Sequence, residues 1–126
     1  MASTPGGPQR WEVEGTDQFI AWYRGLSEPL SHAVDAAVEL LERFGPSLAR
    51  PYADTLKQSR HANMKELRVR YRGDAYRVLF AFDTRRTAIL LLGGRKADSK
   101  WYEKAVAQAD KLYDEHLEEL KREGLL

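Results

Sequence analysis

The chain has 126 residues, of which 43% are hydrophobic and 31% charged, which is typical of one globular domain. It contains no cysteine and no run approaching the roughly 18 apolar residues of a membrane span, so disulfide scaffolds, thiol catalysis and membrane insertion are not expected. The net charge is +1, but residues 57–104 hold thirteen Lys or Arg against five Asp or Glu, while the segments before and after are acidic (four against eight, three against six). This asymmetry predicts a localised surface for a polyanion.

The N-terminal part is expected to be an arm followed by a helical pair. MASTPGGPQR, residues 1–10, has no apolar signal segment and is predicted to be a disordered arm ahead of one domain over 11–126, in the cytoplasm. The alternation in 11–14 predicts a first strand. Thr16 and Ser27 are typical N-caps of two helices that end at Gly25 and Gly45. This α-hairpin needs a sheet to cover its apolar face.

The centre of the chain predicts three antiparallel strands. After an expected linker over residues 46–63, alternating patterns predict strands over 64–71 and 76–83, and an apolar run predicts a central strand over 87–92. A last helix is predicted from Ser99 onward. The fold class is therefore α+β, with the helices gathered on one face of a small antiparallel sheet. The cations expected on the opposite, open face are Arg68, Arg70 and Arg77.

The segment GGRKADSKWY, residues 93–102, places cations and aromatic side chains just after the last strand, with Gly93-Gly94 interpreted as a flexible exit. Acidic residues suit a helix N-terminus better than cations do, so this composition indicates an anionic ligand. Trp101 or Tyr102 could stack a nucleobase, or Trp101 could belong to the core and Tyr102 could cap a helix edge. The residues predicted to contact RNA are Lys65, Arg70, Arg95, Lys100 and Trp101.

The three histidines predict no metal site. His32, His61 and His116 lie on separate predicted elements, and no cysteine accompanies them at ligand spacing. No glycine-rich loop of the nucleotide-binding type is present either, so no cofactor is predicted.

The order and spacing of several motifs resemble those of a known family. The motifs are LLERFGPSLARPYADTLKQSRHANMKELRVRYRGDAYRVLFAF over residues 40–82 and AILLLGGRK over 88–96, followed by a helix. Over roughly residues 11–115 the chain is similar to the RelE/ParE toxin superfamily, in particular to its phage-derived, HigB-type branch. The resemblance implies a RelE-like fold, in which an N-terminal strand and an α-hairpin pack on a small antiparallel sheet with a C-terminal helix.

The resemblance also implies an activity and its residues. RelE- and HigB-type proteins are ribosome-dependent mRNA endonucleases of type II toxin–antitoxin systems, and the family pattern places catalytic residues at Arg68, Arg77, Lys96 and Tyr102. Glu66 departs from RelE, which has a lysine there, although Glu-Leu-Arg is typical of the HigB-like branch. The implied partners are the ribosome with its mRNA and a cognate antitoxin, a small helix-turn-helix protein that would cover the basic face.

Metal-independent cleavage of RNA defines what these residues would do. The substrate's 2′-hydroxyl attacks the adjacent phosphorus and expels the 5′-oxygen, and guanidinium groups stabilise the extra negative charge. Arg77 is expected to be the main residue that binds the phosphate and stabilises its extra charge in the transition state. Tyr102 is the candidate acid or base, with cations favouring its phenolate, and Lys96 could share that role. Glu66 could hold the arginines by ion pairs or act as the general base.

Two other functions remain open at the level of the sequence. The ParE branch shares the fold but targets gyrase and lacks the nuclease residues, so a gyrase inhibitor is one alternative. A non-catalytic module that binds RNA or a protein partner is the other.

Overall fold

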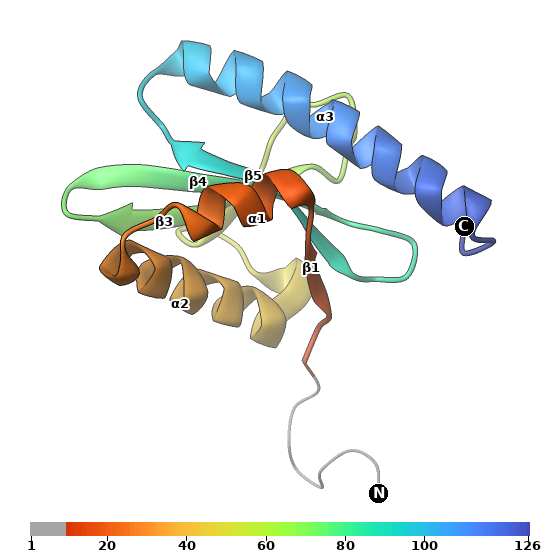
Figure 1. Ribbon diagram of the computed structural model, residues 1–126, viewed down its shortest axis with the longest axis horizontal. Coiled ribbons are helices and arrows are strands. Elements are labelled where there is room, and N and C mark those ends of the chain that lie inside the picture. Colours follow the sequence, from red (N-terminus) through yellow and green to blue (C-terminus); the bar gives the residue numbers. More distant parts are fainter. Residues whose placement is uncertain (1–9) are drawn as a thin grey trace, which may run out of the picture.

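The computed structural model describes residues 10–126, so the arm predicted for residues 1–10 falls almost wholly outside the described residues. The α+β class and the predicted order of strand, α-hairpin, strands and helix are confirmed (Figure 1). In chain order the elements are β1 (Val13–Gly15), α1 (Asp17–Arg24), α2 (Glu28–Phe44), the short 3-10 helix η1 (Gly45–Ser47), β2 (Ala53–Thr55), β3 (Lys65–Tyr71), β4 (Asp74–Phe82), β5 (Ala88–Arg95) and α3 (Ser99–Arg122).

The strands form one mixed sheet in the order β1-β5-β4-β3-β2. β1 pairs in parallel with β5, and the other neighbours are antiparallel. β2 lies within residues 46–63, so the prediction of a linker there is partly wrong. A strand of three residues is too short to show an alternating pattern in the sequence, and its pairing with β3 defines it. None of the helices in residues 10–126 is both long and apolar enough to cross a membrane.

β5 is longer than the sequence predicts. Gly93 and Gly94, interpreted as a flexible exit, are paired residues of the strand, opposite Val78 and Arg77 on β4. A Cβ on Gly93 would lie 2.4 Å from the Trp22 ring, so glycine is required there for the close approach of α1 rather than for flexibility.

The α-hairpin begins at the two predicted caps. The Thr16 hydroxyl accepts a hydrogen bond from the Phe19 backbone N–H at 3.1 Å and donates to the Leu91 carbonyl at 2.6 Å, which ties the start of α1 to β5. The Ser27 hydroxyl accepts from the Leu30 backbone N–H at 3.4 Å. Both caps satisfy donors that have no partner within their own helix.

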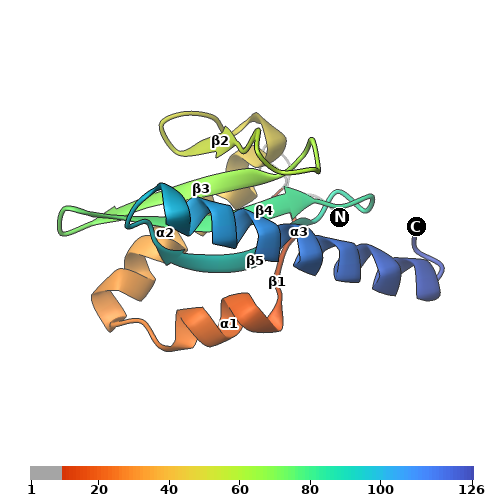
Figure 2. The ribbon, with the colours of Figure 1, turned by 90° about the horizontal axis from the view of Figure 1, so that it is seen from above.

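The helices cover both faces of the sheet, and the prediction that all gather on one face is wrong. α1 and α2 lie on one side of the sheet and α3 crosses the other (Figures 1 and 2). The first core joins the α-hairpin to Leu67, Val78 and Phe80. The second joins α3 to Leu79 and Ala81, whose apolar side chains alternate with those of the first core along β4. Arg77 therefore does not lie on an open face: the start of α3 partly covers it.

Candidate active site

A buried carboxylate, Glu66 on β3, lies at the centre of a polar cluster on the α3 side of the sheet. Only 5% of its side chain is exposed. Its Oε1 accepts a hydrogen bond of 2.5 Å from the Tyr102 hydroxyl and lies 3.3 Å from Arg77 Nε, while Oε2 accepts from Arg68 Nε at 3.1 Å. Arg77 Nε also donates to the Tyr102 hydroxyl oxygen at 3.0 Å. We call these four residues the Glu66 cluster.

The sheet register explains why this carboxylate is needed. Arg68 and Arg77 are direct partners across β3 and β4, and like charges in that position destabilise a sheet. Glu66 lies two residues before Arg68 on the same face and compensates both guanidiniums. Arg68 is further held by Asp54 of β2, whose Oδ2 lies 3.4 Å from Arg68 Nη2. The expected ion pairs of Glu66 with Arg68 and Arg77 are confirmed.

Tyr102 is a neutral phenol in this setting. Burial raises its pKa above the usual value near 10, and the hydrogen bond to the Glu66 carboxylate raises it further. The hydrogen bond from Arg77 acts in the opposite direction but does not outweigh these two causes. The expectation that neighbouring cations favour a phenolate is therefore wrong. Tyr102 is suited to donate a proton rather than to accept one.

Trp101 fixes the first turn of α3 against the sheet. A Cβ on Gly94 would lie 2.9 Å from its indole, so glycine at this position allows the ring to lie on the β5 backbone. The Asp98 carboxylate caps the helix by accepting from the Trp101 backbone N–H at 3.1 Å. The Trp101 and Tyr102 rings meet edge to face, with centroids 5.2 Å apart. Trp101 thus contributes to the packing that positions Tyr102.

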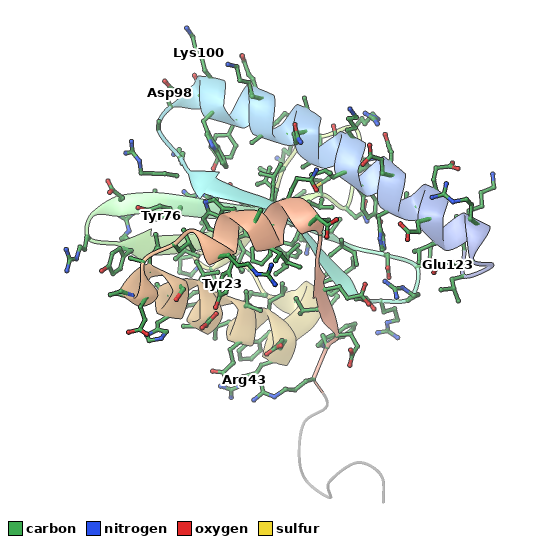
Figure 3. The ribbon with its side chains drawn as sticks, in the orientation of Figure 1. Tyr23, Arg43, Tyr76, Asp98, Lys100 and Glu123 are labelled. Carbon is green, nitrogen blue, oxygen red and sulfur yellow. The ribbon has the colours of Figure 1, made fainter. Side chains whose placement is uncertain are left out.

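The other predicted site residues lie at different distances from the cluster. Lys96 Nζ is 5.7 Å from the centroid of the Tyr102 ring, and Arg70 is exposed on β3. Arg95 Nη1 lies 3.9 Å from Asp74 at the β3–β4 turn, and Lys65 Nζ donates to the Pro46 carbonyl at 3.2 Å. Lys100 points outward from the start of α3, away from the sheet (Figure 3). Lys96 thus contacts Tyr102 and Arg70 shares a hollow with Arg68 and Arg77, whereas Lys65 and Arg95 are bonded to Pro46 and Asp74, and Lys100 points away from the sheet.

Two hollows flank the Glu66 cluster. One of about 500 Å³ lies along the first turns of α3 and includes Gln58, Tyr102 and Glu103. The other, of about 370 Å³, is lined by Pro51, Tyr52, Arg68, Val69, Arg70, Ala75 and Arg77. A third hollow, of about 430 Å³, lies between α1 and α2 on the opposite face of the sheet and contains none of the predicted site residues.

Sequence reasoning missed the contribution of β2 to this site. Tyr52 and Asp54 lie in the segment predicted to be a linker, and both border the cationic residues of β3. The sequence signal there is Ala53 between two polar neighbours, a period-two pattern too short to separate from a loop.

The fold and site together define a small α+β protein with a cationic cluster between its sheet and its C-terminal helix. Residues 21–114 match the family described as phage-derived protein Gp49-like (DUF891), and the chain belongs to this family. Two proteins of Mycobacterium tuberculosis are similar in sequence. “Putative toxin HigB2” is 43% identical over 110 residues, covering 85% of this chain and 54% of its own length. “Putative toxin HigB3” is 45% identical over 95 residues, covering 74% and 82%. The chain thus spans about half the length of the first relative.

Solved structures of RelE proteins share the fold. The toxin–antitoxin complex RelBE2 of M. tuberculosis aligns with a TM-score of 0.52 and 21% identity, over 71% of this chain and 95% of that one. A mutant of the E. coli toxin RelE in the free state aligns with a TM-score of 0.58 and 12% identity, over 79% and 98%. The resemblance to HigB-type proteins is confirmed in sequence, and the RelE-like fold is confirmed by the solved structures.

Proposed function

We propose that this chain is the toxin of a type II toxin–antitoxin system and that it cleaves mRNA on the ribosome. The observation that carries the proposal is the Glu66 cluster, in which two guanidiniums and a protonated phenol converge beside a cationic hollow. The names of the two M. tuberculosis relatives and the RelE fold support the toxin assignment. The protein would act in the cytoplasm, where mRNA is translated.

The proposed chemistry needs no cofactor. The 2′-hydroxyl of a nucleotide attacks the adjacent phosphorus and loses its proton to solvent water, while the bond from phosphorus to the 5′-oxygen breaks and that oxygen takes the proton of Tyr102. The products are a 2′,3′-cyclic phosphate and a 5′-hydroxyl, and the Tyr102 phenolate recovers a proton from solvent. Arg77, supported by Arg68, stabilises the phosphorane, because planar guanidiniums form paired hydrogen bonds to phosphate oxygens. Glu66 is too buried to contact RNA directly and acts by orienting both arginines and the phenol. Lys96 adds positive charge beside Tyr102.

The proposed partners follow from the same surface. A cognate antitoxin, of the helix-turn-helix type usual for HigB-like toxins, would silence the toxin by laying an acidic or apolar segment over the Glu66 cluster and Arg70. Similar structures include RelE bound to its antitoxin, which supports a partner of this kind. The ribosome would present the mRNA as a single strand.

The decisive experiment compares mRNA 5′ ends a few minutes after induced expression of the wild-type chain and of Arg77→Ala in bacteria. We expect new ends inside translated regions for the wild type and a loss of at least about a hundredfold for Arg77→Ala, as for removal of one group that stabilises the transition state. Arg43→Ala is the matched control, because Arg43 is exposed at the far end of α2 (Figure 3).

Two other outcomes would favour the two alternative functions. Growth arrest with intact mRNA would contradict the nuclease and favour the gyrase inhibitor. Normal growth and intact mRNA in the presence of folded protein would favour a non-catalytic binding module. Circular dichroism of each purified variant separates loss of activity from loss of fold, which matters because only 11% of the Arg77 side chain is exposed.

A further inference from the structure

Tyr52 is an exposed aromatic residue in a cationic setting. Among the aromatic side chains of residues 10–126, Tyr52 and Phe44 are the most exposed, at 51% and 48%. Tyr52 borders the 370 Å³ hollow together with Arg68, Arg70 and Arg77. An aromatic ring that remains half exposed leaves apolar area in water, and a functional contact is one reason for a fold to retain it.

The backbone holds Tyr52 firmly while leaving its side chain accessible. The Tyr52 carbonyl accepts a hydrogen bond from the Arg68 backbone N–H at 2.9 Å, and the Tyr52 N–H donates to the Ala49 carbonyl at 2.9 Å. Ala53, the next residue, is fully buried in the core on the α2 side. Tyr52 itself precedes β2, and it lines the same hollow as Arg68 and Arg77, which places its side chain on the face of the sheet that carries these two arginines.

We propose that Tyr52 is a stacking platform for an unpaired nucleobase of single-stranded RNA, next to the phosphate held by Arg77. This inference rests on the proposed function and extends it to a binding site at the turn that leads into β2. Proteins that bind single strands combine cations for the backbone with aromatic faces for the bases. The hollow beside β2 offers both, since Arg70 is exposed and Arg68 and Arg77 line its floor.

The other two aromatic candidates are less available for this role. Trp101 lies against Gly94, and Tyr102 is hydrogen-bonded to both Glu66 and Arg77. The hollow along α3 is lined by Glu103 and Asp110, whose charges disfavour an RNA backbone. The strand is therefore expected to approach the Glu66 cluster from the β2 side.

The test measures binding separately from cleavage. The probe is a fluorescent single-stranded RNA of about ten nucleotides, a length within the usual site sizes of single-strand binders. It is fully 2′-O-methylated, so it keeps bases and phosphates but has no 2′-hydroxyl to attack. Binding is measured by fluorescence anisotropy at one fixed salt concentration, because phosphate contacts make affinity depend strongly on salt. A second probe of the same length carries an abasic site at every position, so it keeps the phosphates but offers no base to stack.

Tyr52→Ala should weaken binding of the base-bearing probe roughly tenfold, the loss typical for one stacking side chain, whereas Tyr52→Phe should bind like the wild type. Phe44→Ala is the matched control, because Phe44 is equally exposed but does not line this hollow, and it should leave the affinity unchanged. On the abasic probe the difference between wild type and Tyr52→Ala should shrink to less than about twofold. Tyr52→Leu, which keeps the bulk without an aromatic face, should behave like Tyr52→Ala.

Three results would overturn the inference: no binding of the probe by the wild type, equal affinity of Tyr52→Ala and wild type, or the same loss on both probes. The last would assign the effect of Tyr52 to packing around Arg68. These results do not depend on cleavage. If the wild type binds through Tyr52 but leaves cellular mRNA intact, the proposed nuclease fails while the stacking site stands.

Discussion

At the scale of single residues, the proposed cleavage depends on the pair formed by Tyr102 and Glu66. Their hydrogen bond of 2.5 Å joins a phenol whose pKa is raised by burial to a carboxylate that also holds two arginines. If the phenol supplies the proton for the leaving 5′-oxygen, its raised pKa keeps that proton in place across the neutral range. Glu66 then orients both the proposed acid, Tyr102, and the two arginines that would stabilise the phosphorane.

Replacing Tyr102 by Phe tests this role at the residue scale. We expect the cleavage rate to fall by about 10²–10⁴-fold, the usual contribution of a general acid, with little change in fold. Tyr23→Phe is the matched control: the Tyr23 hydroxyl donates to Asp35 at 2.6 Å, and its pKa is also raised, chiefly by that hydrogen bond, but it lies on the α-hairpin side of the sheet. Cleavage assays on purified ribosomes with both variants make the comparison.

The pH dependence distinguishes an acid from a base. With a raised pKa, Tyr102 stays protonated below about pH 10, so it should cause no rise in the Tyr102-dependent part of the rate between about pH 7 and 9. A rate that climbs tenfold per pH unit in that range, and does so only when Tyr102 is present, would instead identify a phenolate base.

At the scale of elements, α3 is the part that completes the site. Its start rests on Gly94 through Trp101, and its middle is attached to the segment before β3, where Ser59 Oγ donates to the buried Asp110 at 2.5 Å. Its later turns reach the β4–β5 loop, where His116 Nε2 lies 2.9 Å from Asp83. Attachment along the helix sets how close Tyr102 comes to Glu66.

Gly94→Ala should displace the start of α3. The added Cβ would lie 2.9 Å from the Trp101 indole, so the ring must move, and overpacking of this kind costs about 1–3 kcal/mol. We expect a lower free energy of unfolding in urea and a cleavage rate reduced more than stability alone explains. Gly25→Ala is the control, because its Cβ would meet no atom closer than 3.6 Å. Unchanged cleavage by Gly94→Ala would show that Trp101 does not position Tyr102.

At the scale of the molecule, a second polar cluster joins three distant parts of the chain. Asp83, whose side chain is fully buried, is bonded to Arg85 Nη2 at 2.7 Å and to His116 on α3, and Arg85 also pairs with Glu14 on β1 at 3.0 Å. Burial alone would raise the pKa of Asp83, but hydrogen bonds from His116, Arg85 and Thr87 lower it on balance. This cluster lies just after the last residue of β4, whereas Arg77 lies near the start of that strand. We therefore assign the cluster a structural role.

The lowered pKa of Asp83 predicts that the free energy of unfolding decreases at acidic pH. An aspartate that is more acidic in the folded chain than its usual value near 3.9 stabilises the fold above that pH, and this contribution is lost as the pH falls through the folded pKa. Asp83→Asn should therefore cost about 3–5 kcal/mol at pH 7, as for other broken buried ion pairs, and progressively less below about pH 4. Urea unfolding at several pH values measures this.

The control for that series is Asp74→Asn. Asp74 is half exposed and lies 3.9 Å from Arg95, so its loss should change the free energy of unfolding by less than about 1 kcal/mol at any pH. If Asp83→Asn were equally mild at pH 7, the cluster would not be what holds α3 to the turn after β4.

Local chemistry along the chain is enough to predict the helix starts and the alternating faces of the strands. Thr16 and Ser27 predict the helix starts because their hydroxyls satisfy backbone donors within one turn, and the alternation around Leu67 and Val78 predicts strands because successive side chains face opposite ways. The site residues Arg68, Arg77 and Tyr102 came from the family resemblance rather than from local chemistry, and the structure places these three side chains in one cluster.

Which helix covers each face of the sheet depends on contacts between distant parts of the chain. A periodic pattern shows which side chains share a face but not which element covers that face. The sequence therefore predicts α3 on the wrong side of the sheet, although Leu79 and Ala81 are apolar residues on the face that α3 covers. Likewise the neutral state of Tyr102 and the position of Tyr52 depend on contacts between residues far apart in the chain. Burial and pairing set both, and they arise only when the sheet and α3 come together.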